Sequence, residues 1–179
     1  MKKKIYIFSL LSLILILCGC GMGNNPKSKV ETVLNRYQNN SGSIESELDD
    51  YLKTLTIDDT YYDDYKKVYI KQYQDLKYEI KDEKINGDIA TVNAEIDVYD
   101  YYKTENDVKN YISTNQNDFM ENGIYSSKKA LKYKIDKLNT TTSRVKYNIT
   151  FHLTKVDDDW TVDNLSNEDL EKIHGVYAH

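Results

Sequence analysis

Apolar residues recur at intervals of three and four through the first part of the chain, which is the spacing of amphipathic helices. One stripe covers residues 30–37 and a second covers residues 48–55. A third helix is predicted from a cap at Asp59 or Thr60 to about Gln74. The pattern therefore predicts three consecutive helices in this part of the chain.

The third predicted helix carries a row of tyrosines on one side. Its members are Tyr62, Tyr65, Tyr69 and Tyr73. Buried tyrosines usually pack in a core while each hydroxyl reaches a polar partner at its edge. The alternative interpretation is that this row forms the wall of a ligand pocket with polar tips.

The periodicity then changes from helical spacing to strict alternation, which indicates strands. Residues 76–81 and residues 90–98 form two alternating runs, and Asn86-Gly87 between them predicts a type I′ hairpin turn. Apolar residues fall on one face of this hairpin and polar residues on the other. We therefore expect a long hairpin with a single buried side.

A capping box at Thr104 and Asp107 predicts a helix that ends at Gly123. Residues 131–138 are ambiguous, because their apolar positions fit either a strand or a helix. Leu131, Tyr133 and Ile135 alternate as in a strand, whereas Leu131, Ile135 and Leu138 have helical spacing. We interpret this segment as a strand.

The end of the chain predicts two more strands and a helix. Residues 145–153 alternate cleanly, residues 157–159 form a polar turn, and residues 160–165 begin a last strand before a helix that Ser166 opens. Taken together, the elements predict an α+β domain in which helices pack on one face of a curved antiparallel sheet of about five strands.

The N-terminus has the pattern of an export signal. Three lysines at residues 2–4 precede an apolar run over residues 5–17. That run is too short for a membrane span, which needs about 20 apolar residues. The motif Leu17-Cys18-Gly19-Cys20 resembles the lipobox of bacterial lipoproteins, in which cleavage precedes a cysteine that receives a diacylglyceryl group. The alternative is an uncleaved anchor that contains two ordinary cysteines.

The lipobox predicts a signal peptide at residues 1–19, a lipidated tether at residues 20–27, and one domain at residues 28–179. Cleavage leaves 21 Lys and Arg against 29 Asp and Glu, which gives a net charge of −8. Two acyl chains on Cys20 would hold this acidic domain at the outer face of the cell membrane. No thiol would then be left for a disulfide or a cysteine metal site. Nucleic acid is not an expected partner of such an acidic extracytoplasmic domain.

The chain resembles the NTF2-like lipoproteins of low-GC Gram-positive bacteria, a group without an established activity. The resemblance covers residues 28–177 beyond the lipobox, and three motifs carry it. They are Ile85-Asn86-Gly87-Asp88-Ile89-Ala90-Thr91-Val92, Asp159-Trp160-Thr161-Val162-Asp163-Asn164-Leu165, and Leu170-Glu171-Lys172-Ile173-His174-Gly175. The resemblance implies a cone in which the sheet wraps a helix and encloses a cavity at its wide end. In some relatives, such as ketosteroid isomerase and scytalone dehydratase, that cavity is an active site, and in others it is a binding or dimer surface.

No residue pattern identifies a catalytic, metal or cofactor site. Glu95 and Asp97 are expected on the polar face of the hairpin, so neither supplies a carboxylate inside an apolar pocket. His152, His174 and His179 lack metal-ligand spacing. We therefore expect no metal and no cofactor.

One cluster of lysines departs from the acidic average. Its members are Lys128, Lys129, Lys132, Lys134, Lys137 and Lys146. A lysine-rich strand edge would discourage edge-to-edge aggregation. The alternative is contact with an anionic wall polymer or with lipid headgroups.

The candidate ligand pocket lies between the third helix and the sheet, where small inner residues of the hairpin would face bulky tyrosines. Its expected lining is Tyr62, Tyr65, Tyr69, Val92, Ala94, Ile96, Tyr147 and Phe151. Such a lining favours an uncharged, partly apolar ligand. Close interlocking of small and large side chains is the alternative.

Three hypotheses for function follow. The favoured one is a non-enzymatic lipoprotein that binds an envelope protein or ligand. The second is a carrier or sensor for a small apolar ligand, and the third is an enzyme of the isomerase or dehydratase kind. A homodimer is compatible with each of the three.

Overall fold

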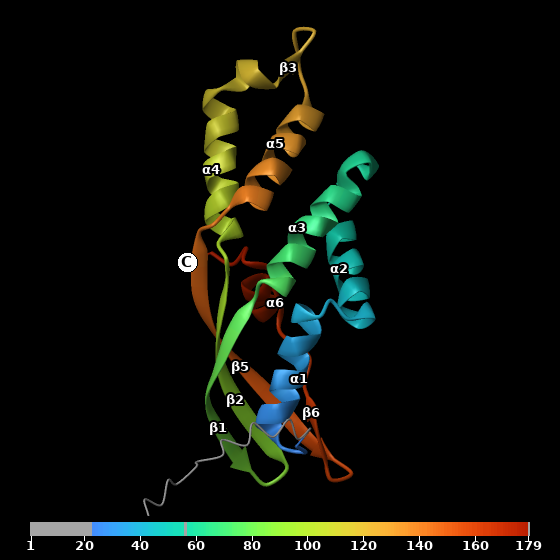
Figure 1. The fold of residues 1–179 in the computed structure, drawn as a ribbon, viewed down its shortest axis with the longest axis vertical. Helices are drawn as coiled ribbons and strands as arrows, with labels where there is room; N and C mark the ends of the chain where they lie inside the picture. The colour runs from blue at the N-terminus through green and yellow to red at the C-terminus, as the bar shows by residue number, and fades with distance from the viewer. Residues whose placement is uncertain (1–22, 56, 179) are drawn as a thin grey trace, which may run out of the picture.

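The computed structural model describes residues 23–55 and 57–178, which form an elongated α+β fold (Figure 1). Its helices are α1 (Pro26–Gln38), α2 (Gly42–Thr54), α3 (Tyr62–Gln74), α4 (Tyr101–Thr114), α5 (Ser127–Thr140) and α6 (Asn167–His174). Its strands are β1 (Lys77–Asn86), β2 (Ile89–Tyr99), β3 (Met120–Glu121), β4 (Ile124–Tyr125), β5 (Arg144–Val156) and β6 (Asp159–Val162). Two short 3-10 helices, η1 (Asp59–Tyr61) and η2 (Gln116–Phe119), precede α3 and β3.

The main sheet is antiparallel and has the strand order β1-β2-β5-β6. Every second residue of β2 is buried, from Ala90 to Val98, and the residues between are partly exposed. Inner residues of neighbouring strands pair directly, so Val92 lies opposite Phe151 and Ala94 opposite Ile149. The hairpin is present, and its predicted one-sided burial holds in β2, whereas in β1 only Tyr78 and Ile80 are partly buried and residues 81–86 are exposed. Helix α1 packs against β2 and β6.

The first described residues are fixed at one end of the sheet. Asn25 caps α1 by accepting a hydrogen bond from the Ser28 backbone N–H at 2.8 Å. The Asn24 side chain donates to the carbonyl of Asp158, in the turn between β5 and β6, at 2.8 Å. Because α1 begins at Pro26, the last two residues of the segment expected as a tether belong to the helix.

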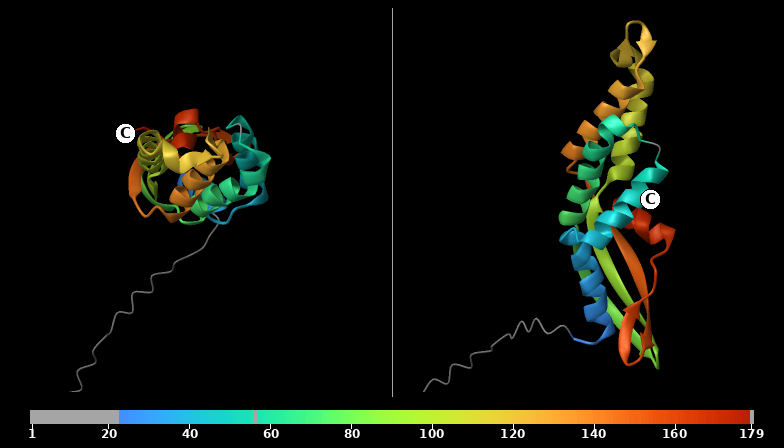
Figure 2. Two further views of the ribbon diagram at one scale, coloured as in Figure 1. Left: turned by 90° about the horizontal axis from the view of Figure 1, so that it is seen from above. Right: turned by 90° about the vertical axis from the view of Figure 1, so that its right-hand side faces the viewer.

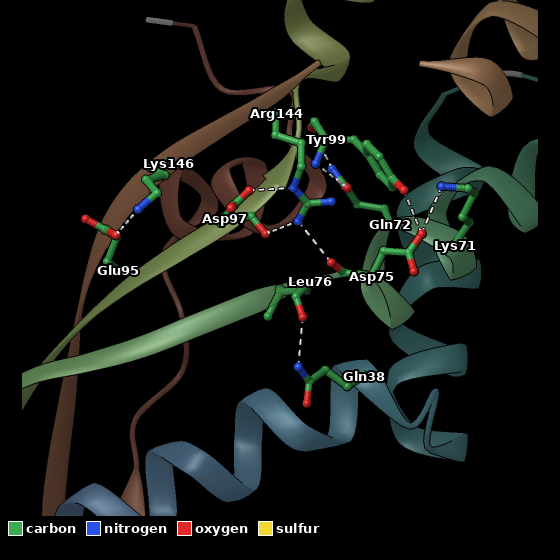
Figure 3. A network of polar contacts seen from close by, with 10 residues as sticks. All are labelled: Gln38, Lys71, Gln72, Asp75, Leu76, Glu95, Asp97, Tyr99, Arg144 and Lys146. Carbon is green, nitrogen blue, oxygen red and sulfur yellow. Dashed lines mark hydrogen bonds and ion pairs between the residues drawn. The ribbon is translucent and has the colours of Figure 1, made fainter. Parts of the chain in front are cut away.

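A polar network joins the end of α3 to the sheet (Figure 3). The Arg144 guanidinium donates to the Asp97 carboxylate at 2.6 Å and to the backbone carbonyl of Asp75 at 2.9 Å. Tyr99 donates its hydroxyl hydrogen to the Asp75 carboxylate at 2.8 Å, and Lys71 lies 3.7 Å over the Tyr99 ring. Asp97 therefore acts structurally on the polar side of the sheet, as does Glu95, which pairs with Lys146 at 2.7 Å.

Helices α4 and α5 lie side by side and project beyond α2 and α3, with the β3–β4 hairpin at their tip (Figures 1 and 2). The tip of this arm lies at the opposite end of the molecule from the β1–β2 and β5–β6 turns. Asp100 caps α4 through the backbone N–H of Lys103 at 2.8 Å, and Ser126 caps α5. Helix α4 thus begins before the predicted capping box and ends at Thr114, well before Gly123.

The interpretation of residues 131–138 as a strand is wrong, because they lie in α5. The helical spacing prevails because Ala130, Ile135 and Leu138 form its buried side. The main sheet consequently has four strands in place of about five. The lysines of this segment lie on a helix, so they cannot protect a strand edge.

Candidate functional site

A cluster of aromatic rings lies where α1, α2, α3 and α6 meet. His174 is in its centre, with ring centroids 4.1 Å from Tyr51, 5.5 Å from Tyr69 and 5.8 Å from Tyr73. Tyr37 packs edge-on against Tyr73 at 5.2 Å. His174 is 6% exposed, so its imidazole is almost wholly enclosed by these rings.

The end of α6 holds His174 in this position. Gly175 ends the helix with a left-handed φ of 74°, and its carbonyl accepts from the backbone N–H of Tyr102 at 2.8 Å. Gln72 is fully buried on α3, and its side-chain amide donates to the Tyr99 carbonyl at 2.9 Å and accepts from the Tyr99 N–H at 2.8 Å (Figure 3). The same amide nitrogen donates to the carbonyl of His174 at 2.9 Å. A single side chain thus joins α3, the end of β2 and the end of α6.

A pocket of about 770 Å³, which we call the His174 pocket, opens beside this cluster. Its aromatic lining is Tyr37, Tyr51, Tyr73 and His174, and its aliphatic lining is Val33, Val162, Leu165 and Leu170. Its charged lining is Arg36, Glu47, Asp50, Asp163 and Glu171, all of them exposed. The pocket therefore has an aromatic and aliphatic interior and a charged rim.

The His174 imidazole carries a buried polar atom without a partner. Its Nδ1 has no hydrogen bond among the described residues. Burial lowers the pKa of His174 to about 3, so the ring is neutral at physiological pH. An unpaired buried polar atom costs about 1–3 kcal/mol. Burial, as the largest cause, also raises the pKa of Tyr37, Tyr51 and Tyr73, so the wall carries no charge.

A second, smaller pocket of about 330 Å³ lies on the other side of Tyr51, and we call it the Tyr65 pocket. Its lining is Tyr51, Leu55, Ile57, Tyr65, Tyr69, Glu105, Leu131, Lys134 and Val176. The Tyr65 hydroxyl donates to the Glu105 carboxylate at 3.3 Å, and Lys134 pairs with Glu105 at 2.7 Å. This pocket therefore has a fixed ion pair at one wall.

The predicted pocket residues fall into separate groups. Tyr65 and Tyr69 line the Tyr65 pocket, whereas Tyr62 turns to α2 and donates to the Asp49 carboxylate at 2.9 Å. The sheet residues Val92, Ala94, Ile96 and Phe151 are at most 1% exposed, and Tyr147 is buried with its hydroxyl on the Tyr177 carbonyl at 2.8 Å. The tyrosine row thus faces other helices as well as the sheet, and a cavity between α3 and the sheet stays a prediction.

Sequence reasoning missed His174 and Gln72 as residues of a site. His174 was weighed only as a metal ligand and was set aside for lack of ligand spacing. Among residues 23–55 and 57–178, no group of three or more His, Cys, Asp or Glu side chains is placed to hold a metal ion. The Leu170 and Ile173 spacing did predict the final helix. Cys20, the predicted lipidation site, lies outside the described residues. In the part of the chain that is described, none of the helices combines the length and apolar character of a membrane span.

Comparisons with known proteins add one distant structural likeness. No protein-family model matches the chain, and no curated protein matches it either. One solved structure that it is similar to is the crystal structure of a "putative lipoprotein (ycdA)" from Bacillus subtilis, at 19% sequence identity and a TM-score of 0.46. The match covers 83% of this chain and 47% of that chain, so this chain spans about half the length of that protein.

Proposed function

We propose that this protein is an extracytoplasmic lipoprotein, held on the membrane by a lipid on Cys20, whose domain is a non-enzymatic binding module. We further propose that its fold is a variant of the NTF2-like cone, with helices on one face of a curved sheet. The observation that carries the binding role is the unpaired Nδ1 of His174 beside the aromatic pocket. A buried polar atom without a partner calls for an explanation, and the one that we propose is a bound ligand that supplies the hydrogen bond.

The lining indicates the class of ligand. A neutral imidazole and three neutral tyrosines favour an uncharged body with apolar or aromatic character, and the imidazole offers one hydrogen bond. The carboxylates of the pocket are exposed at its rim, in positions where water keeps them solvated. Isomerase chemistry would instead need a carboxylate enclosed in the apolar interior. These placements support a binding role for the His174 pocket.

The anchor is tested by acyl labelling in a Gram-positive host. We expect labelled palmitate on the wild-type protein and none on Cys20→Ser. Cys18→Ser is the matched control, because it removes the neighbouring thiol and keeps the lipidated one. Equal labelling of wild type and Cys20→Ser would contradict the proposed anchor.

The binding role is tested with indole, a small uncharged aromatic probe with one N–H donor. We expect saturable changes in the imidazole NMR signals of His174 in the full chain held in phosphatidylcholine nanodiscs. His174→Phe should abolish binding, which is read in that variant from the NMR signals of indole itself, whereas Leu131→Trp, which fills the Tyr65 pocket, should leave binding unchanged. If Leu131→Trp lost binding while His174→Phe kept it, the result would favour a carrier or sensor site at Tyr65 and Tyr69.

A further inference from the structure

The arm formed by α4, η2, β3, β4 and α5 has a small core of its own, which gives it a defined shape. Tyr111 stacks on Tyr133 with ring centroids 5.0 Å apart, and Phe119 packs edge-on against Tyr133 at 5.4 Å. Phe119 is buried, as is Ala130 on α5. Lys129 fastens the hairpin to α5 by donating to the carbonyl of Met120 at 2.8 Å.

A groove of about 890 Å³ runs along α4, and we call it the α4 groove. Four of its residues, Glu105, Val108, Lys109 and Ile112, follow the spacing i, i+3, i+4, i+7 and so form one stripe of the helix. Met120 and Tyr125 continue the apolar surface toward the tip, and Lys134 borders it from α5. The groove therefore combines an aliphatic floor of Val108 and Ile112 with the cationic side chain of Lys109 and with the ion pair of Glu105 and Lys134.

The tip of the arm exposes large apolar side chains. Ile124 is 73% exposed, Tyr125 is 49% exposed and Tyr111 is 41% exposed. Exposed apolar residues that lie together beside a groove are typical of a protein interaction surface. Tyr125 also lines the α4 groove, and Ile124 precedes it in β4.

The arm is basic in a protein that is otherwise acidic. Residues 101–140 carry seven lysines against five carboxylates, whereas the whole chain has 24 basic and 29 acidic residues. Among the described residues, Lys109, Lys129 and Lys137 form no ion pair, so their charges are available to a partner. Charge complementarity therefore favours an acidic occupant over a basic or neutral one.

We propose that the α4 groove binds an amphipathic helix of a partner protein, with apolar residues on one face and carboxylates beside them. The stripe of α4 offers ridges at the spacing that an apolar helix face fits. Lys109 and Lys129 would meet the flanking carboxylates, and Ile124 and Tyr125 would cover the end of the bound helix. This binding is independent of the His174 pocket. None of the residues that line the His174 pocket also lines the α4 groove.

The test uses two synthetic helical peptides that share leucines at i, i+3, i+4 and i+7. One carries glutamates at the flanking positions and the other carries lysines. With the full chain in phosphatidylcholine nanodiscs, we expect the acidic peptide to shift the methyl NMR signals of Ile112 and Ile124 and the lysine peptide to bind at least tenfold more weakly. Added salt should weaken the acidic complex.

Variants locate the contact. Ile112→Glu should abolish binding, and Lys109→Glu, an exposed change that should not disturb folding, should weaken it at least tenfold. Val156→Glu alters an exposed aliphatic residue at the opposite end of the molecule and should have no effect. Equal binding of both peptides, or binding that Lys109→Glu leaves unchanged, would overturn the proposal. Two further results would also overturn the proposal. Binding to phosphatidylglycerol vesicles that depends on the tip, without peptide binding, would favour a membrane as the occupant. Self-association that Ile112→Glu removes would favour a second copy of the chain.

Discussion

The side-chain amide of Gln72 donates a hydrogen bond of 2.9 Å to the backbone carbonyl of His174, 102 residues further along the chain. The same amide nitrogen donates to the Tyr99 carbonyl, and the amide oxygen accepts from the Tyr99 N–H. Gln72 therefore fixes the end of α6 against α3 and β2. The position of the imidazole in the His174 pocket depends on this contact.

Replacing Gln72 with a residue of similar size and no polar atoms should destabilise the fold. Gln72→Met leaves the buried carbonyl of His174 and the partly buried carbonyl and N–H of Tyr99 without the partner that they share, so we expect a loss of about 2–4 kcal/mol. Gln38→Met is the matched control, because Gln38 makes one partly buried bond to the Leu76 carbonyl at 2.8 Å and should cost about 1 kcal/mol or less. Urea unfolding of both variants measures the difference, and equal costs would contradict the assigned role of Gln72.

Glycine is required at residue 175 for two reasons. Its φ of 74° is unfavourable for other residues by about 1–2 kcal/mol, and a Cβ atom there would overlap the Tyr99 carbonyl oxygen and the Gln72 amide nitrogen. Gly175→Ala should therefore cost more than strain alone and should shift the NMR signals of His174. Gly87→Ala has a similar φ of 61° with open space around it, so it isolates the strain. Thermal unfolding of the pair tests this, and equal losses would show that the overlap is relieved at no cost.

The strands of the main sheet and most helices were predictable because each has a single dominant periodicity, whereas the two-residue strands β3 and β4 were not predicted. The alternation of β2 and β5 and the stripe of α1 correspond to their buried sides. The hairpin turn was misplaced by one residue, since Asn86 still pairs with Ile89 and the turn is formed by Gly87 and Asp88. Gly87 supplies the positive φ that the turn needs.

Residues 131–138 could not be assigned from periodicity, because both patterns were present. The contacts that favour the helix come from elsewhere: α4 packs alongside α5, and Tyr133 stacks on Tyr111 at 5.0 Å. The His174 pocket could not be predicted from the sequence either, because α1, α2, α3 and α6 all contribute to it. A histidine in the last turn of a short helix carries no local signal of burial, and Gln72, which positions it, is distant in sequence.

Trp160 is 7% exposed, and it should contribute strongly to the stability of the sheet. It pairs with Lys155 across β5 and β6, and its backbone N–H donates to the Asn24 side chain at 3.4 Å. Trp160→Ala should cost about 3–5 kcal/mol, as for other buried aromatic residues. Val156→Ala, an exposed change on the neighbouring strand, should cost less than about 0.5 kcal/mol. Urea midpoints decide this, and an unchanged midpoint for Trp160→Ala would refute the burial.

The titration of His174 should make the stability of the protein depend on pH in a defined window. Burial lowers the pKa of His174 from its ordinary 6.5 to about 3, so the folded state holds the imidazole neutral while the unfolded state binds a proton below pH 6.5. Stability is therefore fully present above pH 6.5 and is lost as the pH falls toward 3, by up to about 1.4 kcal/mol per pH unit. His174→Phe fills the same aromatic space and has no titrating group.

The free energies of unfolding of wild type and His174→Phe, measured from pH 7 to pH 4, isolate this contribution. Their difference should shift in favour of the variant as the pH falls, because acidic groups elsewhere are common to both proteins. At pH 7 His174→Phe should be as stable as wild type or more stable, since it removes an unpaired polar atom from a buried site. If His174→Phe is more stable than wild type and the wild-type His174 signals respond to indole, ligand binding would explain why a destabilising histidine is present. A parallel pH dependence in the two proteins would instead mean that water already reaches the imidazole, and it would remove the main support for the His174 pocket as the binding site.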